Sequence, residues 1–387
     1  MISRKITNIL KERLTKFPVL SLTGPRQSGK TTLLQNEFPD YKYFNLERID
    51  HREMIQSDIM GFLEDQGPGV IFDETQRLPE LFSYIQVISD ERGQAGQYIL
   101  SGSQSFLMND QISQSLAGRT HVSHLFPFGI TEIPSENRSI SETIFNGFYP
   151  RLYDMGINAV DFYPSYIQTY IERDIRSLKA IDDLNSFSRF MGLCAGRIGQ
   201  VLNMNSLAND TGVTVNTVKS WLSLLEASFI LYRLQPYYRN FNKRLIKSPK
   251  LYFYDTGIAS SLLKIQDPDM IKTHYMYGSL YENLIISEIL KSFHHNGKIP
   301  HIYYWRESNG TEIDCLIEKG AQKMIALEIK AGKTFNKDYL KNLKKFPPES
   351  KDLEKSVIYA GDQSSKISGI NLISHAGLID FLENLHA

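Results

Sequence analysis

The chain has 387 residues, of which 42% are hydrophobic and 22% are charged, enough for two or three domains with cores of ordinary size. Its 43 basic and 43 acidic residues cancel, so no overall field holds it to nucleic acid or membrane, and such a contact needs a local patch. Cys194 and Cys315 belong to no paired motif, which argues against a disulfide framework or zinc site and fits a reducing compartment. No apolar run reaches the roughly 18 residues that span a bilayer. We therefore expect a soluble, cytoplasmic protein without a membrane partner.

The first informative element is a glycine-rich loop with the sequence GPRQSGKTT at residues 24–32. It lies between an apolar run at 18–22, predicted to be a strand, and a segment at 32–37, predicted to be a helix. Such a loop directs backbone N–H groups onto phosphate oxygens at the positive end of the helix. The predicted nucleotide-binding residues are Gly24, Pro25, Arg26, Gln27, Ser28, Gly29, Lys30, Thr31 and Thr32. Lys30 would reach the β- and γ-phosphates, and Thr31 would ligate Mg²⁺.

Short apolar runs separated by helical stretches predict an α/β fold with a parallel sheet. The expected strands cover residues 43–46, 70–73, 98–101 and 121–125. Asp73 and Glu74 stand at the carboxyl end of the second of these strands, where ligands of open α/β sheets bind. Asp73 would hold Mg²⁺ through water, and Glu74 would orient and polarise the attacking water. Alternatively, the two acids cap the next helix.

Polar residues follow the strand at 98–101, and Ser103 or Gln104 there could report whether a γ-phosphate is present. The ordered loop, acidic pair and polar strand end resemble the AAA+ ATPases over about residues 15–130. The resemblance implies that the nucleotide is ATP and that it is hydrolysed. The SLAGR stretch ending at Arg119 is similar to the Leu-x-Gly-Arg stretch of a group of prokaryotic ATPases. That similarity implies an arginine that senses nucleotide or stabilises transition-state charge, in its own subunit or in a neighbour within a homo-oligomer; an ordinary structural arginine is the alternative.

The middle of the chain breaks the sheet pattern. We expect three domains, covering residues 1–150, 151–265 and 266–387. A helix predicted over residues 163–181 carries Arg173, a second candidate for reaching a nucleotide. A solvated or interdomain face with weak local ion pairs explains this charged helix more simply.

Residues 206–222 have the spacing of a helix-turn-helix. Strand-like runs at 229–234 and 251–254 complete a predicted winged helix. The stretch 236–250 contains five basic residues, the last of them Lys250, and no acid, which predicts contact with DNA phosphates. The candidate DNA contacts are Arg239, Lys243, Arg244 and Lys247. Winged helices also serve as ATPase lids and protein interfaces, so both interpretations stay open.

The C-terminal third is predicted to form a helix at 278–290 followed by a β-hairpin with strands at 311–317 and 324–330. Its candidate site residues are Glu282, Asp314, Glu328 and Lys330. Period-two alternation places the last two on one face of their strand, where the aspartate of the neighbouring strand can meet them. The three acids could surround one or two Mg²⁺ ions, with the lysine positioning or activating water.

This order of a helix acid, a strand aspartate and Glu-x-Lys resembles the PD-(D/E)xK nuclease superfamily over about residues 275–335. The resemblance implies a nuclease-like α/β fold; cleavage of nucleic acid and a binding role without cleavage are both compatible with it. The order of the three parts resembles prokaryotic ATPases that carry an uncharacterised C-terminal domain of this fold. We therefore predict an ATP-hydrolysing switch coupled to a DNA-binding winged helix and a nuclease-like domain. The alternative is an ATP-regulated interaction module with an inactive nuclease fold, while a small-molecule kinase is disfavoured because Glu74 suits water activation.

Overall fold

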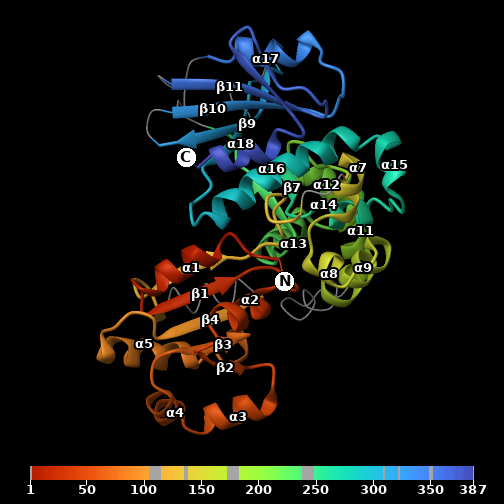
Figure 1. Ribbon diagram of the computed structural model, residues 1–387. Helices are drawn as coiled ribbons and strands as arrows, with labels where there is room; N and C mark the ends of the chain where they lie inside the picture. Colours follow the sequence, from red (N-terminus) through yellow and green to blue (C-terminus); the bar gives the residue numbers. More distant parts are fainter. Residues whose placement is uncertain are drawn as a thin grey trace. The chain divides into compact units, whose positions relative to one another are not determined.

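The computed structural model divides into two compact units (Figure 1). The described residues are 2–103, 115–134, 138–171, 183–237, 248–307, 310–320, 323–347 and 352–386. Unit 1 comprises Met1–Phe128, Ala227–Phe229 and His294–Lys298, and unit 2 comprises Gly129–Glu226, Ile230–Phe293 and Ile299–Ala387. The three-domain division predicted from the sequence stays a prediction. Among the described residues, no helix has both the length and the apolar character needed to cross a membrane.

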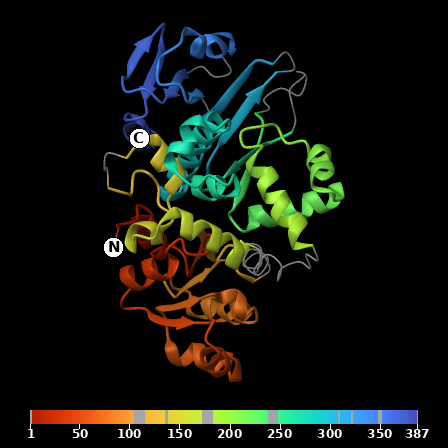
Figure 2. The same cartoon turned by 90° about the vertical axis from the view of Figure 1, so that its right-hand side faces the viewer.

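Within the described residues, unit 1 is built on a five-stranded parallel sheet with the order β2-β3-β4-β1-β5. The strands are β1 (Val19–Thr23), β2 (Lys42–Asn45), β3 (Val70–Asp73), β4 (Tyr98–Gly102) and β5 (Thr120–His124). The helices of this unit are α1 (Thr7–Leu14), α2 (Lys30–Glu37), α3 (Ile49–Ser57), α4 (Ile59–Gln66), the 3₁₀ turn η1 (Thr75–Arg77) and α5 (Leu81–Arg92). The expected parallel α/β arrangement is confirmed, and each predicted strand lies within one residue of its observed position. In Figures 1 and 2, α3 and α4 lie together beyond the β2 edge of the sheet.

The central strands of this sheet are buried on both faces, which explains why they appear in the sequence as unbroken apolar runs. Val70 and Phe72 of β3 point into one apolar core, whereas Ile71 between them points into a second core with Leu20 and Leu22 of β1. Because both faces of the sheet are covered, a ligand can reach it at the ends of the strands. The phosphate loop directly follows the carboxyl end of β1.

Unit 2 begins with a largely helical region. Its elements are α7 (Ile140–Asn146), α8 (Pro150–Asp154), α9 (Ala159–Tyr166), the π-helical turn η2 (Ile167–Ile171), α11 (Leu184–Ala195), α12 (Met204–Thr211), α13 (Val215–Ala227), β6 (Leu231–Leu234), β7 (Lys250–Phe253), α14 (Thr256–Leu262), α15 (Pro268–Thr273) and α16 (Tyr277–His295). The helix predicted over 163–181 begins earlier, in α9, and changes to π-helical geometry after Tyr166; Arg173 lies outside the described residues.

The predicted helix-turn-helix is observed as α12 and α13. Gly212 ends α12 with a φ of 82°, a left-handed conformation that glycine adopts without a Cβ penalty. Thr214 then accepts a hydrogen bond from the amide of Thr217 at 3.1 Å, in the manner of an N-cap. Strands β6 and β7 follow and pair antiparallel. The helix pair and the strand pair are therefore confirmed, while a DNA-binding winged helix stays a prediction.

The part of the chain that the structure describes also forms a six-stranded mixed sheet in unit 2, with the order β12-β13-β11-β10-β9-β8. Its elements are β8 (Ile302–Arg306), β9 (Glu312–Lys319), β10 (Lys323–Lys330), η3 (Lys337–Leu340), α17 (Lys341–Lys345), β11 (Asp352–Tyr359), β12 (Ser365–Ile367), β13 (Ile370–Ser374) and α18 (Leu378–Asn384). Strands β9 and β10 form the predicted antiparallel hairpin, and β10, β11 and β13 run parallel. Leu340 and Leu343 from η3 and α17 pack against one face of this sheet.

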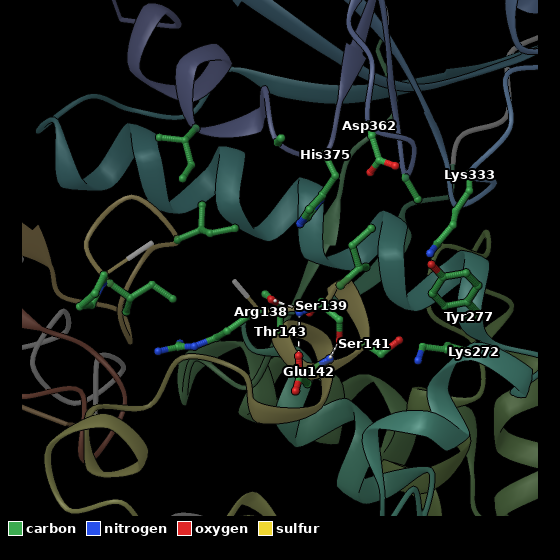
Figure 3. Close-up of a pocket in the computed structure, with 17 residues that line it drawn as sticks. Arg138, Ser139, Ser141, Glu142, Thr143, Lys272, Tyr277, Lys333, Asp362 and His375 are labelled. Carbon is green, nitrogen blue, oxygen red and sulfur yellow. Dashed lines mark hydrogen bonds between the residues drawn. The ribbon is translucent and has the colours of Figure 1, made fainter. Parts of the chain in front are cut away.

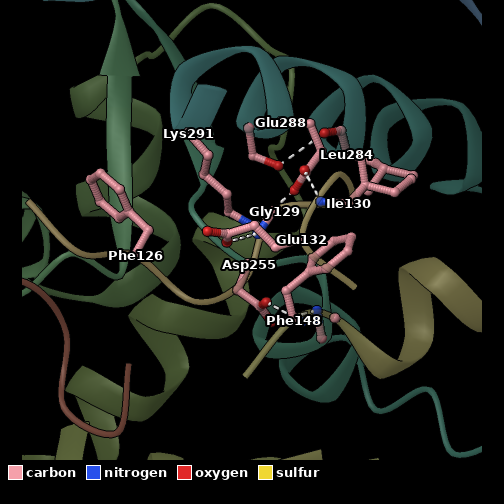
Figure 4. A network of polar contacts seen from close by, with 12 residues as sticks. Phe126, Gly129, Ile130, Glu132, Phe148, Asp255, Leu284, Glu288 and Lys291 are labelled. Carbon is pink, nitrogen blue, oxygen red and sulfur yellow. Dashed lines mark hydrogen bonds and ion pairs between the residues drawn. The ribbon is translucent and has the colours of Figure 1, made fainter. Parts of the chain in front are cut away.

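A buried polar network holds the start of unit 2 together (Figure 4). Asp255 caps α14 and accepts hydrogen bonds from the Phe148 amide at 2.7 Å and the Tyr163 hydroxyl at 2.8 Å. Glu288 accepts from Lys291 at 2.8 Å and from the Ile130 amide. Burial raises the pKa of Asp255 and of Glu288. Buried carboxylates are tolerated when such donors satisfy them. Asp255 thus holds the start of α14 against Phe148 and Tyr163, and Glu288 holds α16 against the loop around Ile130.

Candidate nucleotide site and carboxylate centre

The phosphate loop depends on two glycines. Gly24 has a φ of 152°, and a Cβ built there would lie 2.1 Å from the carbonyl oxygen of Leu125, so no other residue fits. Gly29 has a φ of 94° and stands immediately before α2. These conformations turn the loop tightly between β1 and α2, as the motif predicts.

Lys30 lies inside the loop rather than in solvent. Its ammonium donates to the carbonyl oxygens of Gly24 and Pro25, each at 2.9 Å, and the residue is 5% exposed. Burial lowers the pKa of Lys30 to about 8, against the opposing effects of Glu74 and Asp73. A protonated amine held by neutral carbonyls can exchange them for phosphate oxygens, which are stronger acceptors.

The residues of the loop fit a bound triphosphate. The Ser28 hydroxyl is buried and, in the described part of the chain, has no hydrogen-bond partner. The first turn of α2 likewise receives no side-chain cap from the described residues, so its N–H groups are available as donors. Phosphate oxygens can satisfy both kinds of donor, because a helix start attracts anions.

Asp73 is the centre of a hydroxyl cluster at the carboxyl edge of the sheet. It accepts hydrogen bonds from Thr31 Oγ1 at 2.6 Å and from the Tyr43 hydroxyl at 2.7 Å. Ser101 Oγ donates to its other carboxylate oxygen. Burial and the charge of Asp73 raise the pKa of Tyr43, which keeps this hydroxyl protonated as a donor. The structure thus brings Thr31 and Asp73 together as predicted for Mg²⁺ ligation, and a carboxylate beside a hydroxyl is an oxygen set that fits this ion. Sequence reasoning missed Tyr43. Ser101 belongs to the polar end of the strand at 98–101 that the sequence singled out, but its contact with Asp73 was not predicted.

Glu74 adopts a left-handed conformation with a φ of 56°, which costs free energy for a residue with a Cβ. Its carboxylate accepts a hydrogen bond from Ser103 Oγ at 3.2 Å and another from Gln76 Nε2. The structure therefore places Ser103 beside the predicted water-activating glutamate, while Gln104 lies outside the described residues. Within those residues, Glu74 makes no side-chain cap on η1, so the helix-capping alternative loses support for this acid.

Arg119 lies at the amino-terminal ends of the strands, whereas the phosphate loop lies at their carboxyl ends. It precedes β5, whose first residue pairs in register with Val19 at the start of β1, whereas the loop follows Thr23. Five residues of strand separate the two ends by about 16 Å. The guanidinium pairs with Asp90 of α5, with one contact at 2.7 Å. In its own chain Arg119 therefore does not join the nucleotide site, and this ion pair favours the structural alternative.

Arg4 contributes to the site and carries no sequence signal. Its guanidinium donates to the carbonyl oxygen of Ser28 at 2.9 Å and to that of Phe126 at 2.6 Å. It is buried and lies over the Phe128 ring, 4.8 Å from the ring centre. Arg4 thus ties the phosphate loop to the chain that leaves β5.

In unit 2, the hairpin brings Asp314, Glu328 and Lys330 together as predicted. The Lys330 ammonium lies 3.2 Å from Asp314 Oδ2 and also pairs with Glu328. Asp314 accepts from the Ile329 amide at 2.8 Å, and Asn342 donates to Glu328 at 3.3 Å. Burial and the nearby Asp314 charge raise the pKa of Glu328 to about 8. Burial alone would raise the pKa of Asp314, but Lys330 and Lys250 together lower it.

Glu282 of α16 is held by residues that the sequence did not connect with it. Lys250 of β7 lies 3.3 Å from Glu282 Oε1 and also pairs with Glu312 of β9. Tyr252 donates to Glu282 at 2.5 Å. Lys250 is 1% exposed, so its assignment to an exposed basic stretch is wrong. Glu312 could have been found, because period two places it on the same strand face as Asp314. The candidate DNA contacts Arg239, Lys243, Arg244 and Lys247 lie outside the described residues.

The carboxylates of unit 2 do not fit the predicted Mg²⁺ site. Among the described residues, no three His, Cys, Asp or Glu side chains are grouped so that they could hold a metal ion. Glu282, Asp314 and Glu328 each accept instead from a lysine ammonium. Mg²⁺ demands near-octahedral oxygen ligands at about 2.1 Å, whereas one oxygen of each of these carboxylates here contacts a lysine ammonium.

A separate cavity of about 750 Å³ opens beyond the carboxyl ends of β10, β11 and β13. Its charged lining residues are Arg138, Glu142, Lys272, Lys333 and Asp362. Figure 3 shows Lys272, Lys333 and Tyr277 gathered at one side of it and His375 pointing inward. Burial lowers the pKa of His375 to about 4, so this imidazole is neutral at pH 7. The charged side chains that line the cavity therefore include both signs.

Comparison with known families bears directly on the phosphate loop. Residues 16–134 match a family model described as AAA domain. Unit 1 contains an ATPase-like P-loop domain of the AAA type. Residues 137–269 and 277–378 match two models described as domains of unknown function, DUF8612 and DUF4143.

Relatives share most of this chain at low identity. An uncharacterized protein of Mycobacterium tuberculosis is 27% identical over 314 residues, which are 80% of this chain and 69% of the relative. One from Haemophilus influenzae is 21% identical over 75% of this chain and 79% of its own length. Among solved structures, a Walker-type ATPase of Pyrococcus abyssi is 15% identical with a TM-score of 0.40, covering 67% of this chain and 94% of that chain. AMPPCP-bound DnaA from Aquifex aeolicus is 15% identical with a TM-score of 0.30, covering 57% of this chain and 86% of that chain.

Proposed function

We propose that the chain is an ATP-binding and ATP-hydrolysing switch. The observation that carries this proposal is the contact between Thr31 and Asp73 at 2.6 Å, beside the buried ammonium of Lys30. A hydroxyl, a carboxylate and a cation lie together there at the carboxyl ends of the parallel strands. Nucleotide-hydrolysing α/β proteins bind their ligands at this end of the sheet. The AAA domain match over residues 16–134 supports the same reaction class.

Each residue has a distinct task in hydrolysis. The loop amides and Ser28 bind phosphate oxygens, and Lys30 neutralises charge between the β- and γ-phosphates. Thr31 and Asp73 would hold Mg²⁺, which supplies further charge neutralisation when bound. Glu74 orients and polarises the attacking water. Ser103, which bonds Glu74 at 3.2 Å, links this glutamate to the end of β4.

Replacing Glu74 by glutamine should separate binding from turnover. Glutamine keeps the size of the side chain but accepts no proton from water, so ATP turnover should fall at least about 100-fold. ATP affinity should change less than about threefold, because the phosphate contacts remain. Single-turnover hydrolysis and equilibrium binding of labelled ATP measure the two effects. Glu80→Gln, a change at an exposed acid before α5, is the control; normal turnover in Glu74→Gln would remove this residue from the mechanism.

For unit 2, we infer a binding role rather than cleavage. The pairing of Lys330 with Asp314 and Glu328 favours a nuclease-like fold that binds nucleic acid or a partner under control of ATP. The basic composition of residues 236–247, with four basic residues and no acid, supports DNA as the ligand, through phosphate contacts that carry no sequence information.

One experiment tests both parts of this inference. Full-length protein with Mg²⁺ and supercoiled or linear DNA should bind the DNA without cutting it, and Asp314→Asn should bind equally well. Exchanging Lys243, Arg244 and Lys247 for alanine should weaken binding and reduce the slope of log affinity against log salt by about 2.7. DNA cleavage by the wild type that Asp314→Asn abolishes would contradict the binding role, and an unchanged salt slope would exclude the basic stretch.

A further inference from the structure

The carboxylate centre of unit 2 is larger than the motif that predicted it. Glu312, two residues before Asp314 on β9, pairs with Lys250 and also contacts Arg306 at 3.1 Å. Among the described residues, the centre therefore joins four carboxylates to three cations. Its acids are Glu282, Glu312, Asp314 and Glu328, and its cations are Lys250, Lys330 and Arg306.

Lys250 occupies the middle of this arrangement. Its ammonium reaches Glu282 on α16 and Glu312 on β9 at the same time. It also acts electrostatically on Asp314. The Tyr304 ring lies 5.6 Å from the ammonium, a distance at which an aromatic face attracts a cation. A buried lysine with contacts to two carboxylates and a ring has little freedom to leave.

The space beside Glu282 is filled as well. Tyr252, from the same strand as Lys250, donates to Glu282 at 2.5 Å. On another side, a Cβ added to Gly199 would lie 3.3 Å from both carboxylate oxygens, so the backbone itself approaches the carboxylate. A divalent cation bound to this carboxylate would lie within a few ångströms of the Lys250 ammonium, and like charges so close inside a protein repel strongly.

We propose that Lys250, together with Lys330, takes the place of a divalent cation, so that the protein itself compensates most of the negative charge of the carboxylate centre and the centre binds no metal ion. The ammonium groups of these two lysines lie beside the carboxylates for which the resemblance to metal-dependent nucleases implies Mg²⁺. This extends the binding role inferred above for unit 2 and rests on it.

The neutralising lysine comes from outside the region that holds the motif. Lys250 belongs to residues 137–269, which match one family model, whereas Glu282, Asp314, Glu328 and Lys330 belong to residues 277–378, which match another. The centre is therefore assembled from two regions of the chain. The motif residues alone would present carboxylates with a single lysine and would attract a cation more strongly.

Binding of Mn²⁺ to full-length, nucleotide-free protein tests the proposal, with bound ion measured from the loss of the free Mn²⁺ signal in electron paramagnetic resonance. Wild type and Asp314→Asn should bind the same amount of Mn²⁺ at every concentration. Any Mn²⁺ bound at Asp73 is the same in both proteins, so a difference between them would report an ion at the carboxylate centre. Lys250→Met removes the charge and keeps the aliphatic stem. It should bind one more Mn²⁺ per chain than wild type does, and the double variant Lys250→Met/Asp314→Asn should lose this additional ion.

Two results would overturn the proposal. One is a Mn²⁺ ion bound by wild type and lost in Asp314→Asn; the other is a folded Lys250→Met protein that gains no ion. If Lys250→Met does not fold, the comparison of wild type with Asp314→Asn decides alone. Lys366→Met, at an exposed lysine of β12, should bind as wild type does. DNA cleavage is scored separately, so a bound ion without cleavage refutes this proposal while the binding role stands.

Discussion

Replacing Lys30 by methionine should lower ATP turnover at least about 100-fold and weaken ATP binding by a similar factor. The methionine fills the space of the aliphatic stem, but it cannot neutralise phosphate charge. The effect should be large because the ammonium is buried, where a charge interaction is stronger than in water. Steady-state turnover and equilibrium binding of labelled ATP in the presence of Mg²⁺ measure the two losses.

The pH dependence provides an independent check on Lys30. Since burial lowers the pKa of this lysine to about 8, it loses its proton in the nucleotide-free protein as the pH rises above 8. Only the protonated form attracts phosphate, so wild-type affinity should fall from pH 8 to pH 9.5, while Lys30→Met should show a flat profile. Lys16→Met, at an exposed lysine paired with Glu12, is the control. Normal ATP binding by Lys30→Met would refute the nucleotide site.

Replacing Lys291 by methionine should lower the free energy of unfolding of unit 2 by about 3–5 kcal/mol, because it leaves buried carboxylates without their cation. Lys291 and Glu288 are 0% and 1% exposed, and the ammonium lies 4.2 Å from the centre of the Phe148 ring. Urea unfolding followed by tryptophan fluorescence measures the loss. Both tryptophans, Trp221 and Trp305, belong to unit 2, so the signal reports this unit.

The chain offers a matched control for this pair. Lys272 and Asp269 have the same i, i+3 spacing and the same separation of 2.8 Å, but they are 54% and 85% exposed. Solvent screens such a pair, so Lys272→Met should leave the urea midpoint unchanged. Equal midpoints for Lys291→Met and Lys272→Met would show that burial does not strengthen the ion pair.

The sequence was most informative where residues that are close together in the chain determine the conformation of a segment. The phosphate loop, the strand before it and the helix after it are neighbours in the chain, so their spacing alone predicts the fold of the segment. The same holds for the hairpin of β9 and β10, whose period-two alternation placed Glu328 and Lys330 on one face. Tertiary contacts did not have to be known for either prediction.

Residues that reach these sites across the fold could not be predicted. Tyr43 meets Asp73 because β2 pairs with β3 in a particular register, and no local pattern encodes that register. Arg4 contacts a carbonyl 122 residues away. Lys250 follows a run of basic residues, which suggested exposure, but packing buries it between α16 and β9. Arg119 matched a motif, but its position at the amino-terminal ends of the strands, away from the phosphate loop, depends on where β5 begins.

Helix α16 carries both Glu282 and the Glu288–Lys291 pair. An α-helix rises about 1.5 Å per residue and hardly stretches, because its backbone hydrogen bonds fix this rise. Glu282 and Glu288 are therefore separated by about 9 Å along the helix axis, and they shift together when the helix shifts. A shift of α16 along its axis would therefore change the contact between Glu288 and the Ile130 amide and the contact between Glu282 and Lys250 at the same time.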